Sequence, residues 1–401
     1  MRLYFLAIRI ASLWNKKAKK LVRGQAQTLD RLRTELSQGE QWIWFHAAST
    51  GEAEQARPII EAMRRQGEHR KILMSFFSPS GYELWAGREA ENGVDKVVYL
   101  PFATRRNAKR FIELLHPETA LFIKYEYWPA YLKELKHRAI PTYSVASVFR
   151  KWQPFFKPLT GKIYRNLLHC FTTLLVQDEA SKELLAQYGI TNVTIVGDPR
   201  FNRVLQVAHS TATDKTTSMF CKGDAPVIVA GSTWDEDERL LVRYINSHPN
   251  VKLVLVPHEI DQEHLHRLFN LFRGRFIRYS EASEQNIQSC QTLLVDKMGL
   301  LSILYRYATV AYIGGGFGAG IHNTLEAAAY GVPVIWGKCY DHFREATDLI
   351  AVGGGFSIRN YKQLEGVLDA QLAVPQEAGR KALAYVESEQ EAVKKIAEEI
   401  R

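Results

Sequence analysis

Short apolar segments that favour β-strands alternate with helical patterns along most of this chain. The first series covers residues 41–46, 71–76, 96–99, 119–123, 141–146, 173–176 and 193–195. A polar stretch at 210–218 interrupts the pattern, and a second series follows at 227–230, 252–256, 275–279, 292–295, 310–313 and 332–336. Strands that alternate with helices form parallel sheets covered on both faces. The sequence therefore predicts two doubly wound α/β domains, joined near residues 205–220.

Length and composition agree with this organisation. We expect an N-terminal segment (1–30), a first domain (31–210), a second domain (211–380) and a C-terminal helix (381–401). A chain of 401 residues with 46% hydrophobic and 24% charged residues can form two such cores. The four cysteines lack the paired spacing of a disulfide framework or a zinc site, which indicates a reducing cytoplasm. They are Cys170, Cys221, Cys290 and Cys339.

The N-terminal segment carries much of the net charge of +9, with no acid before Asp30. Its basic residues are Arg2, Arg9, Lys16, Lys17, Lys19, Lys20 and Arg23. The apolar run at 3–14 is interrupted by Arg9, is too short to span a bilayer, and lacks the cleavage site of a signal peptide. We expect an amphipathic helix that lies on an anionic membrane surface. The alternative is an ordinary first helix that packs on the protein.

A glycine-rich segment at 313–336 is the most distinctive motif. Three glycines directly follow the strand at 310–313, His322 and Asn323 come next, and a helix is expected from about Thr324. Glycines allow close backbone approach, and a helix N-terminus attracts phosphate. The segment matches neither a Walker loop nor a dinucleotide fingerprint. Glu326 lies one helical turn after Asn323, so both can face one ligand. We take Gly315, Gly316, His322, Asn323 and Glu326 as candidate binding residues; a tight turn without a ligand is the alternative.

Glu52 is the candidate general base. It follows the predicted strand at 41–46 and starts a helix, at an edge of the sheet where ligands bind. Ser49, Thr50 and Gly51 precede it and offer hydroxyl and amide groups to an anionic substrate. A carboxylate that only caps the helix remains the alternative. No serine-hydrolase elbow is present.

Four further strand ends carry candidate binding residues. Gly231-Ser232-Thr233 is suited to phosphate or carboxylate, or to a simple N-cap, and the acidic run 235–238 behind it is expected to be a solvated face without a metal. Met298-Gly299 could contact a nucleobase through the backbone. The remaining candidates are Lys124 and Glu126, in an aromatic cluster at 124–129, and Arg200, as an anion contact. Because all these segments follow predicted strands, we expect the two domains to face a cleft.

These elements occur together in one order: HAASTGE, SPSG, KYEYWP, GDPRF, GSTWDEDE, VPHE, DKMGLLSILY and GGGFGAGIHNTLEAAAYGVPVIWG. The series, which covers about residues 1–385, resembles the bacterial 3-deoxy-D-manno-octulosonic acid (Kdo) transferases of lipopolysaccharide biosynthesis. The resemblance implies a GT-B glycosyltransferase with two Rossmann-like domains. Such an enzyme moves Kdo from CMP-Kdo to a lipid A precursor (lipid IVA type), inverts the anomeric configuration and uses neither a cofactor nor a catalytic metal.

The resemblance also implies roles for particular residues. Glu52 falls on the proposed base of the family, and Lys124 and Glu126 would shape the Kdo and acceptor site. The CMP moiety would be bound by Ser232, Thr233, Met298, Gly299, Gly315, Asn323 and Glu326, with Glu326 on the ribose hydroxyls. The first domain would hold the lipid acceptor. The enzyme would act at the cytoplasmic face of the inner membrane, held there peripherally or by its N-terminal segment.

The chain departs from the family pattern in two places. Arginines usually follow the valine-proline strand, whereas this chain has His258-Glu259-Ile260 there, so His258 would replace a phosphate contact only in part. Leu300-Leu301 stands where an acid is usual after Met-Gly.

Three other functions were considered. A GT-B enzyme could use another nucleotide sugar, or the fold could serve as a non-catalytic membrane-associated binding module, although the presence of Glu52 argues against the latter. Nucleic-acid binding is not expected, because the basic N-terminal segment has an apolar membrane-type pattern and no RNA or DNA motif.

Overall fold

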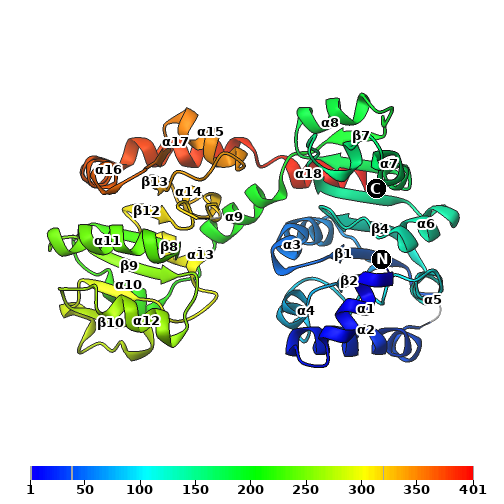
Figure 1. Cartoon of the computed structure of the whole chain (residues 1–401), viewed down its shortest axis with the longest axis horizontal. Helices are drawn as coiled ribbons and strands as arrows, with labels where there is room; N and C mark the ends of the chain where they lie inside the picture. Colours follow the sequence, from blue (N-terminus) through cyan, green and yellow to red (C-terminus); the bar gives the residue numbers. More distant parts are fainter. Residues whose placement is uncertain (1, 38, 319, 401) are drawn as a thin grey trace. The chain divides into compact units, whose positions relative to one another are not determined.

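The structure is a computed structural model that describes residues 2–37, 39–318 and 320–400 (Figure 1). The chain divides into two compact units. The N-terminal unit contains the residues up to Arg203 together with those from Gln390 onward, and the C-terminal unit contains Val204–Glu389. Among the described residues, each unit has one seven-stranded parallel sheet covered by helices, which confirms the predicted α/β fold class.

The N-terminal sheet has the strand order β3-β2-β1-β4-β5-β6-β7, with parallel neighbours throughout. Its strands are β1 (Trp42–Ala47), β2 (Lys71–Phe76), β3 (Lys96–Tyr99), β4 (Pro117–Ile123), β5 (Thr142–Ser147), β6 (Thr173–Val176) and β7 (Val193–Ile195). The chain runs outward from β1 to β3 and then returns to β4 on the other side of β1. The carboxyl ends of β1 and β4 therefore form a topological switch point, where open α/β sheets bind ligands.

Two helices of the N-terminal unit precede its first strand, and the others follow its strands. They are α1 (Arg2–Ala11), α2 (Lys16–Glu35), α3 (Thr50–Arg65), α4 (Pro79–Trp85), α5 (Arg105–Leu115), α6 (Pro129–His137), η1 (Pro154–Phe156), α7 (Gly161–Leu168) and α8 (Glu179–Ala186). Helix α9 (Pro199–His209) crosses the boundary between the units, and α18 (Ala392–Glu399) returns to the N-terminal unit. None of the helices in the described residues is long and apolar enough to cross a membrane.

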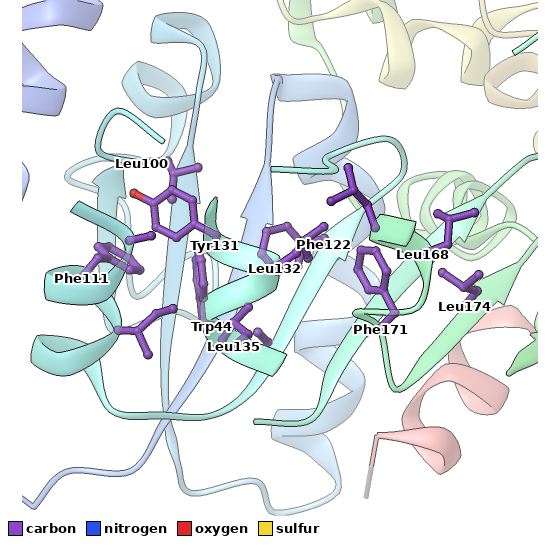
Figure 2. Packing of buried hydrophobic residues seen from close by; sticks show 14 of the residues in the cluster. Trp44, Leu100, Phe111, Phe122, Tyr131, Leu132, Leu135, Leu168, Phe171 and Leu174 are labelled. Atoms are coloured by element: carbon purple, nitrogen blue, oxygen red, sulfur yellow. The ribbon is translucent and has the colours of Figure 1, made fainter. Parts of the chain in front are cut away.

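Leucine and aromatic side chains make up most of the core on one face of the N-terminal sheet (Figure 2). Helix α5 has its apolar residues at positions 108, 111, 112 and 115, a spacing that places them on one helix face. Phe111 packs on Trp44 of β1 with ring centroids 4.9 Å apart, and Tyr131 of α6 lies 5.6 Å from Trp44. The hydroxyl of Tyr131 donates a hydrogen bond of 2.8 Å to the carbonyl of Pro101, so its polar end is also satisfied.

The opposite face of this sheet is completed by the end of the chain. Helix α3 buries Ala53, Ile59 and Ile60 against the strands, and α4 adds Trp85. Helix α18 packs against α3 and contributes Val393 and Ile396 to the same core. The last residues are therefore part of the N-terminal unit.

The C-terminal sheet has the order β10-β11-β9-β8-β12-β13-β14, again with parallel neighbours. Its strands are β8 (Val227–Thr233), β9 (Lys252–Pro257), β10 (Phe276–Arg278), β11 (Thr292–Leu294), β12 (Val310–Ile313), β13 (Val334–Trp336) and β14 (Gly355–Ser357). Its helices are α10 (Lys215–Phe220), α11 (Asp235–Ser247), α12 (Gln262–Phe269), η2 (Tyr279–Glu281), η3 (Ile287–Ser289), α13 (Leu301–Leu304), η4 (Tyr305–Tyr307), α14 (Leu325–Ala328), α15 (Arg344–Val352), α16 (Tyr361–Ala373) and α17 (Pro375–Ser388). Strands β8 and β12 are neighbours at its centre.

Some element boundaries differ from those predicted. Helix α3 begins at Thr50, with Ser49 as its N-cap, whereas the sequence predicted a start at about Glu52. Strand β14 was missed, since Gly-Phe-Ser carries no apolar run. The expected C-terminal helix is instead two helices, α17 and α18, and no glycine or proline marks the break between them.

Candidate active site

The carboxyl ends of β1 and β4 bring the first set of candidate residues together in the N-terminal unit. Ser49–Glu52 follows β1, and Lys124–Trp128 follows β4. Because the two strands are paired in the sheet, both segments start at the same edge. Glu52 and Glu126, predicted from separate motifs, are close enough for the charge of one to affect the ionisation of the other.

Glu52 is a partly buried carboxylate in the first turn of α3. One of its oxygens accepts a hydrogen bond of 2.5 Å from the backbone amide of Ala48, so it does contribute to helix capping. Burial and the nearby negative charge of Glu126 nevertheless raise the pKa of Glu52, and the hydrogen bonds from the backbone offset this only in part. A carboxylate with a raised pKa accepts protons better than an exposed one. The capping role and a role as base are therefore compatible.

Glu126 is held by side chains from two neighbouring segments. The indole Nε1 of Trp128 donates a hydrogen bond of 2.6 Å to the carboxylate of Glu126. The Nε2 of His46, a fully buried residue of β1, lies 2.9 Å from the same carboxylate oxygen. The two contacting nitrogens, which lie 3.0 Å from each other, fix the position of the Glu126 carboxylate.

A buried serine sets the orientation of His46. Ser75 of β2 accepts a hydrogen bond of 2.8 Å from the indole of Trp44, and its hydroxyl lies 2.9 Å from Nδ1 of His46. The carbonyl oxygen of Ser75 lies 3.0 Å from the same Nδ1 and can only accept, so Nδ1 of His46 carries a hydrogen toward Ser75. Sequence reasoning missed Ser75, although a polar residue inside the apolar strand 71–76 was a visible signal.

Lys124 and Arg200 lie near a buried aspartate. Lys124 adopts a left-handed backbone conformation (φ 57°) directly after β4, and its carbonyl accepts a hydrogen bond from Ser147. Arg200 forms an ion pair of 2.7 Å with Asp198. Burial alone would raise the pKa of Asp198, but Arg200 and then Lys124 outweigh it and lower that pKa. The predicted anion contact at Arg200 is thus a guanidinium already bound to an acid.

The second set of candidates lies at the ends of β8 and β12 in the C-terminal unit. Gly314–Gly316 follows β12 and packs against the end of β8, where Ser232 has φ 54°. A Cβ atom at Gly314 would lie 2.2 Å from the carbonyl oxygen of Ser232, and one at Gly316 would lie 2.5 Å from the amide nitrogen of Gly337. These glycines are therefore required by close backbone packing, whether or not a ligand binds.

Asp237 fixes the glycine turn. Its carboxylate accepts hydrogen bonds from the amides of Gly315 (2.9 Å) and Trp234 (3.0 Å) and from the hydroxyl of Tyr312 (2.7 Å). Burial raises the pKa of Asp237 even though these three donors favour the charged form. The sequence prediction of a solvated acidic face at 235–238 is wrong for Asp237 and Glu238, which are both buried. Their apolar surroundings and hydrogen-bond partners are tertiary features that the local acidic run does not reveal.

Glu238 is held by hydrogen bonds that are separate from those of Asp237. It accepts hydrogen bonds from the hydroxyl of Thr233 (2.9 Å) and from Nε2 of His264 (2.8 Å). With Asp235 and His264, it forms a group whose ligand atoms lie within 4.8 Å of one another. Within this group His264 is hydrogen-bonded to Glu238, and a carboxylate oxygen of Asp235 lies 3.7 Å from Nε2 of His264. Thr233, a predicted substrate contact, is fully buried and directs its hydroxyl to Glu238.

Three rings stack next to the glycine turn. The Trp234 and His258 ring centroids are 4.7 Å apart, and those of His258 and His322 are 4.6 Å apart. Burial, and to a lesser extent the proximity of His258, lower the pKa of His322. His258, which stands where this chain departs from the family pattern, thus lies beside the predicted binding residue His322. Trp234 was not predicted from the sequence, although it stands directly before helix α11.

The remaining predicted residues lie on the segments around this turn. The side-chain amide of Asn323 donates a hydrogen bond of 3.0 Å to Glu326, so the two side chains lie together, while a ligand that both face stays a prediction. Met298 is exposed after β11, and Gly299 has φ 84°. The following Leu301 lies close to Gly231 at the end of β8, so the Met-Gly turn is next to the second candidate strand end.

Sequence comparisons find similarity to Kdo transferases. Residues 19–203 match the family model described as 3-deoxy-D-manno-octulosonic-acid transferase. A 3-deoxy-D-manno-octulosonic acid transferase of Aquifex aeolicus is 26% identical over 84% of this chain and 87% of its own length. That of Haemophilus influenzae is 27% identical over 76% and 72%, respectively. A bifunctional glycosyltransferase/methyltransferase of Fusobacterium nucleatum is 24% identical over 81% of this chain, which spans about half (51%) of that protein.

Solved structures support the fold. A UDP-GlcNAc 2-epimerase from Neisseria meningitidis has a TM-score of 0.65 over 90% of this chain and 98% of its own, at 13% identity. A glycosyltransferase from Rickettsia africae has a TM-score of 0.58 over 90% and 99%, at 12% identity. At such low identities these likenesses concern the fold alone. The sequence matches thus show a glycosyltransferase that is similar to Kdo transferases over most of its length and matches the model of that family at residues 19–203, and the solved structures show the fold of two Rossmann-like domains (GT-B).

Proposed function

We propose that this enzyme transfers Kdo from CMP-Kdo to a hydroxyl group of a lipid A precursor of the lipid IVA type, with inversion at the anomeric carbon. The observation that best supports this proposal is the pair of carboxylates, Glu52 and Glu126, at the topological switch point formed by the carboxyl ends of β1 and β4. Glu52 has a raised pKa and stands beside a Glu126 that His46 and Trp128 hold in place. Such a pair, with one carboxylate held in place and the other with a raised pKa that favours proton uptake, is suited to activating a hydroxyl group.

The proposed reaction is one displacement step. Glu52 takes the proton from the acceptor hydroxyl, and the oxygen then attacks the anomeric carbon of Kdo. The bond between that carbon and the phosphate oxygen breaks, and CMP leaves with the electron pair. The proton ends on Glu52, and no metal takes part. Because the nucleophile and leaving group occupy opposite faces of the sugar, the configuration inverts.

Donor binding would fall to the C-terminal unit. The amide of Gly316, at the end of β12, is a candidate for the phosphate, whereas the amide of Gly315 already donates to Asp237 and would position the turn. Asn323 and Glu326, joined by their hydrogen bond, would bind the ribose hydroxyls. The Met298-Gly299 turn would contact cytosine, and the stacked His258 and His322 would take over part of the phosphate contact that arginines make in the family pattern.

Acceptor binding would fall to the N-terminal unit, which we also propose to rest on the inner membrane at its cytoplasmic face. The two parts of the N-terminal segment differ in how much apolar side-chain surface they expose. Helix α2 is an ordinary packed helix, since Leu21 and Leu32 are buried and Lys20 forms an ion pair with Glu83. Beyond α1, by contrast, Leu13 and Trp14 expose 79% and 72% of their surface. The apolar membrane contact is therefore assigned to the first part of the segment.

The decisive assay offers purified protein a tetraacylated lipid A precursor with CMP-Kdo, and separately with UDP-sugars, and identifies the lipid product by mass spectrometry. A mass increase of one or more Kdo residues only with CMP-Kdo is expected. Transfer from a UDP-sugar would contradict the proposed donor. No product with any donor would favour a non-catalytic binding protein.

A further inference from the structure

The segment that follows β5 and includes the first residues of α7 exposes large apolar side chains that the fold does not need at the surface. Trp152, Leu159 and Ile163 expose 72%, 95% and 70% of their area, and Tyr164 exposes 43%. Single exposed apolar residues are common on soluble proteins. Four within residues 152–164 form a concentrated apolar surface. We call residues 151–164 the apolar-basic loop.

The apolar-basic loop is fixed on the N-terminal unit by buried aromatic residues. Phe155 and Phe156 belong to the core, and the ring of Phe155 lies 5.6 Å from that of Phe149 and 5.1 Å from that of Tyr127. Arg165 of α7 donates a hydrogen bond of 2.6 Å to the carbonyl of Phe155, which folds the loop back on the helix. Because these inward residues hold the loop, Trp152, Leu159 and Ile163 contribute little to the core.

Positive charge accompanies the exposed apolar residues. No acidic residue occurs between Glu134 and Asp178. Arg150 pairs with Asp178 at 2.7 Å, so its charge is balanced. Lys151, Lys157 and Lys162 are exposed and form no ion pair with the residues that the structure describes. The loop therefore presents uncompensated positive charge between its apolar side chains.

The apolar-basic loop and the N-terminal segment lie at the same edge of the N-terminal sheet. The loop begins just past the carboxyl end of β5. Arg9 of α1 lies over the ring of Phe102, just past the carboxyl end of β3, at 5.1 Å. Both segments thus adjoin the edge of the N-terminal sheet at which Glu52 lies.

We propose that the apolar-basic loop is a second membrane contact, with an anionic lipid bilayer as its partner. Trp152, Leu159 and Ile163 enter the boundary between headgroups and acyl chains, while the three lysines bind anionic headgroups. This combination of apolar and basic side chains fits a charged bilayer better than a protein groove, which would also require acidic partners for the lysines. The proposal adds to the contact assigned to the N-terminal segment and does not depend on the donor or on Glu52.

Flotation of the full chain with lipid vesicles tests the apolar part. The variant Trp152→Ser/Leu159→Ser/Ile163→Ser is compared with wild type on vesicles of phosphatidylglycerol and phosphatidylethanolamine. We expect its vesicle affinity to fall about tenfold or more. The matched control is a triple serine variant of the C-terminal unit at Phe269, Leu271 and Val374, which expose 52%, 39% and 61%; its affinity should stay within about twofold. An affinity that is unchanged, or that falls as in the control, would overturn the proposal.

A charge variant tests the lysines. The variant Lys151→Gln/Lys157→Gln/Lys162→Gln should bind phosphatidylglycerol vesicles on the order of 100-fold more weakly, since each lysine contributes about fivefold near an anionic surface. Its weak binding to phosphatidylcholine vesicles should not change. Equal losses on both vesicle types would refute the assigned role of the lysines. Circular dichroism checks folding, and turnover of a detergent-dispersed acceptor should stay at the wild-type level, so failure here is distinguishable from failure of the proposed reaction.

Discussion

Gly314 lies where β8 and β12 end side by side, and an alanine there should destabilise the C-terminal unit. The added Cβ would lie 2.2 Å from the carbonyl oxygen of Ser232 and 2.5 Å from the Cα of Thr233. Both neighbours are backbone atoms, so neither can rotate away. Cβ atoms essentially never lie within 3.0 Å of such atoms. The two strand ends would have to move apart by roughly 0.8 Å, which breaks close packing at the centre of the sheet.

The expected cost follows from two opposing effects. Overpacking of this kind costs about 1–3 kcal/mol, whereas replacing glycine by alanine restricts the unfolded chain and returns about 0.4–1 kcal/mol. The difference between the midpoints of these ranges is about 1.3 kcal/mol, by which we expect Gly314→Ala to lower the free energy of unfolding of the C-terminal unit. Gly318→Ala is the matched control in the same segment, because its nearest contact would be 3.9 Å away. It should be neutral or slightly stabilising.

Urea unfolding followed by circular dichroism measures this difference. Hydrogen exchange of the peptides that contain β8 and β12 locates it, since amides at both strand ends should exchange faster in Gly314→Ala. If Gly314→Ala is as stable as Gly318→Ala, the close packing does not explain the glycine run, and the argument that these glycines are structurally required is wrong.

Three further predictions concern the N-terminal unit. Glu126→Gln removes a charge that raises the pKa of Glu52, so the acid limb of the pH profile of kcat/KM should move to lower pH; a limb that stays in place would exclude this coupling. The pKa of Glu52 is raised in the folded state, so the folded protein loses stability as pH rises through that pKa. Glu52→Gln removes this loss and should unfold at a higher urea concentration than wild type at pH 7. The difference between the two proteins should vanish below the ordinary carboxyl range. Ile396→Ala, in a fully buried position of α18, should cost the N-terminal unit about 2–5 kcal/mol in urea unfolding, and a loss confined to the C-terminal unit would contradict its placement.

The strand pattern alone predicted most of the fold. Strands such as β2 and β12 were delimited correctly, because buried parallel strands are continuous apolar runs with clear ends. Strand β14 carries no such run and was missed. The place of α18 in the N-terminal unit could not be predicted from local sequence, since it depends on a long-range contact with α3.

The candidate site also contains residues that the local sequence predicted and residues that it did not. Glu52, Glu126 and the pair Asn323–Glu326 were found because they follow strands in short polar motifs. The residues that hold the site segments in place, Ser75 and Asp237, were not predicted, because they act through tertiary hydrogen bonds. The acidic run at 235–238 was misinterpreted for the same reason: burial is a property of the packed unit, and a charged tetrapeptide does not reveal it.

The most direct test of the account compares Glu52→Ala with Glu54→Gln in the proposed Kdo transfer assay. Glu54 lies on the same helix but pairs with Arg57 and Arg203, so its substitution controls for charge loss on α3. We predict that Glu52→Ala binds CMP with wild-type affinity yet loses turnover by about 100-fold or more, as expected for a missing general base, while Glu54→Gln retains most of it. Wild-type turnover by Glu52→Ala would contradict the central claim.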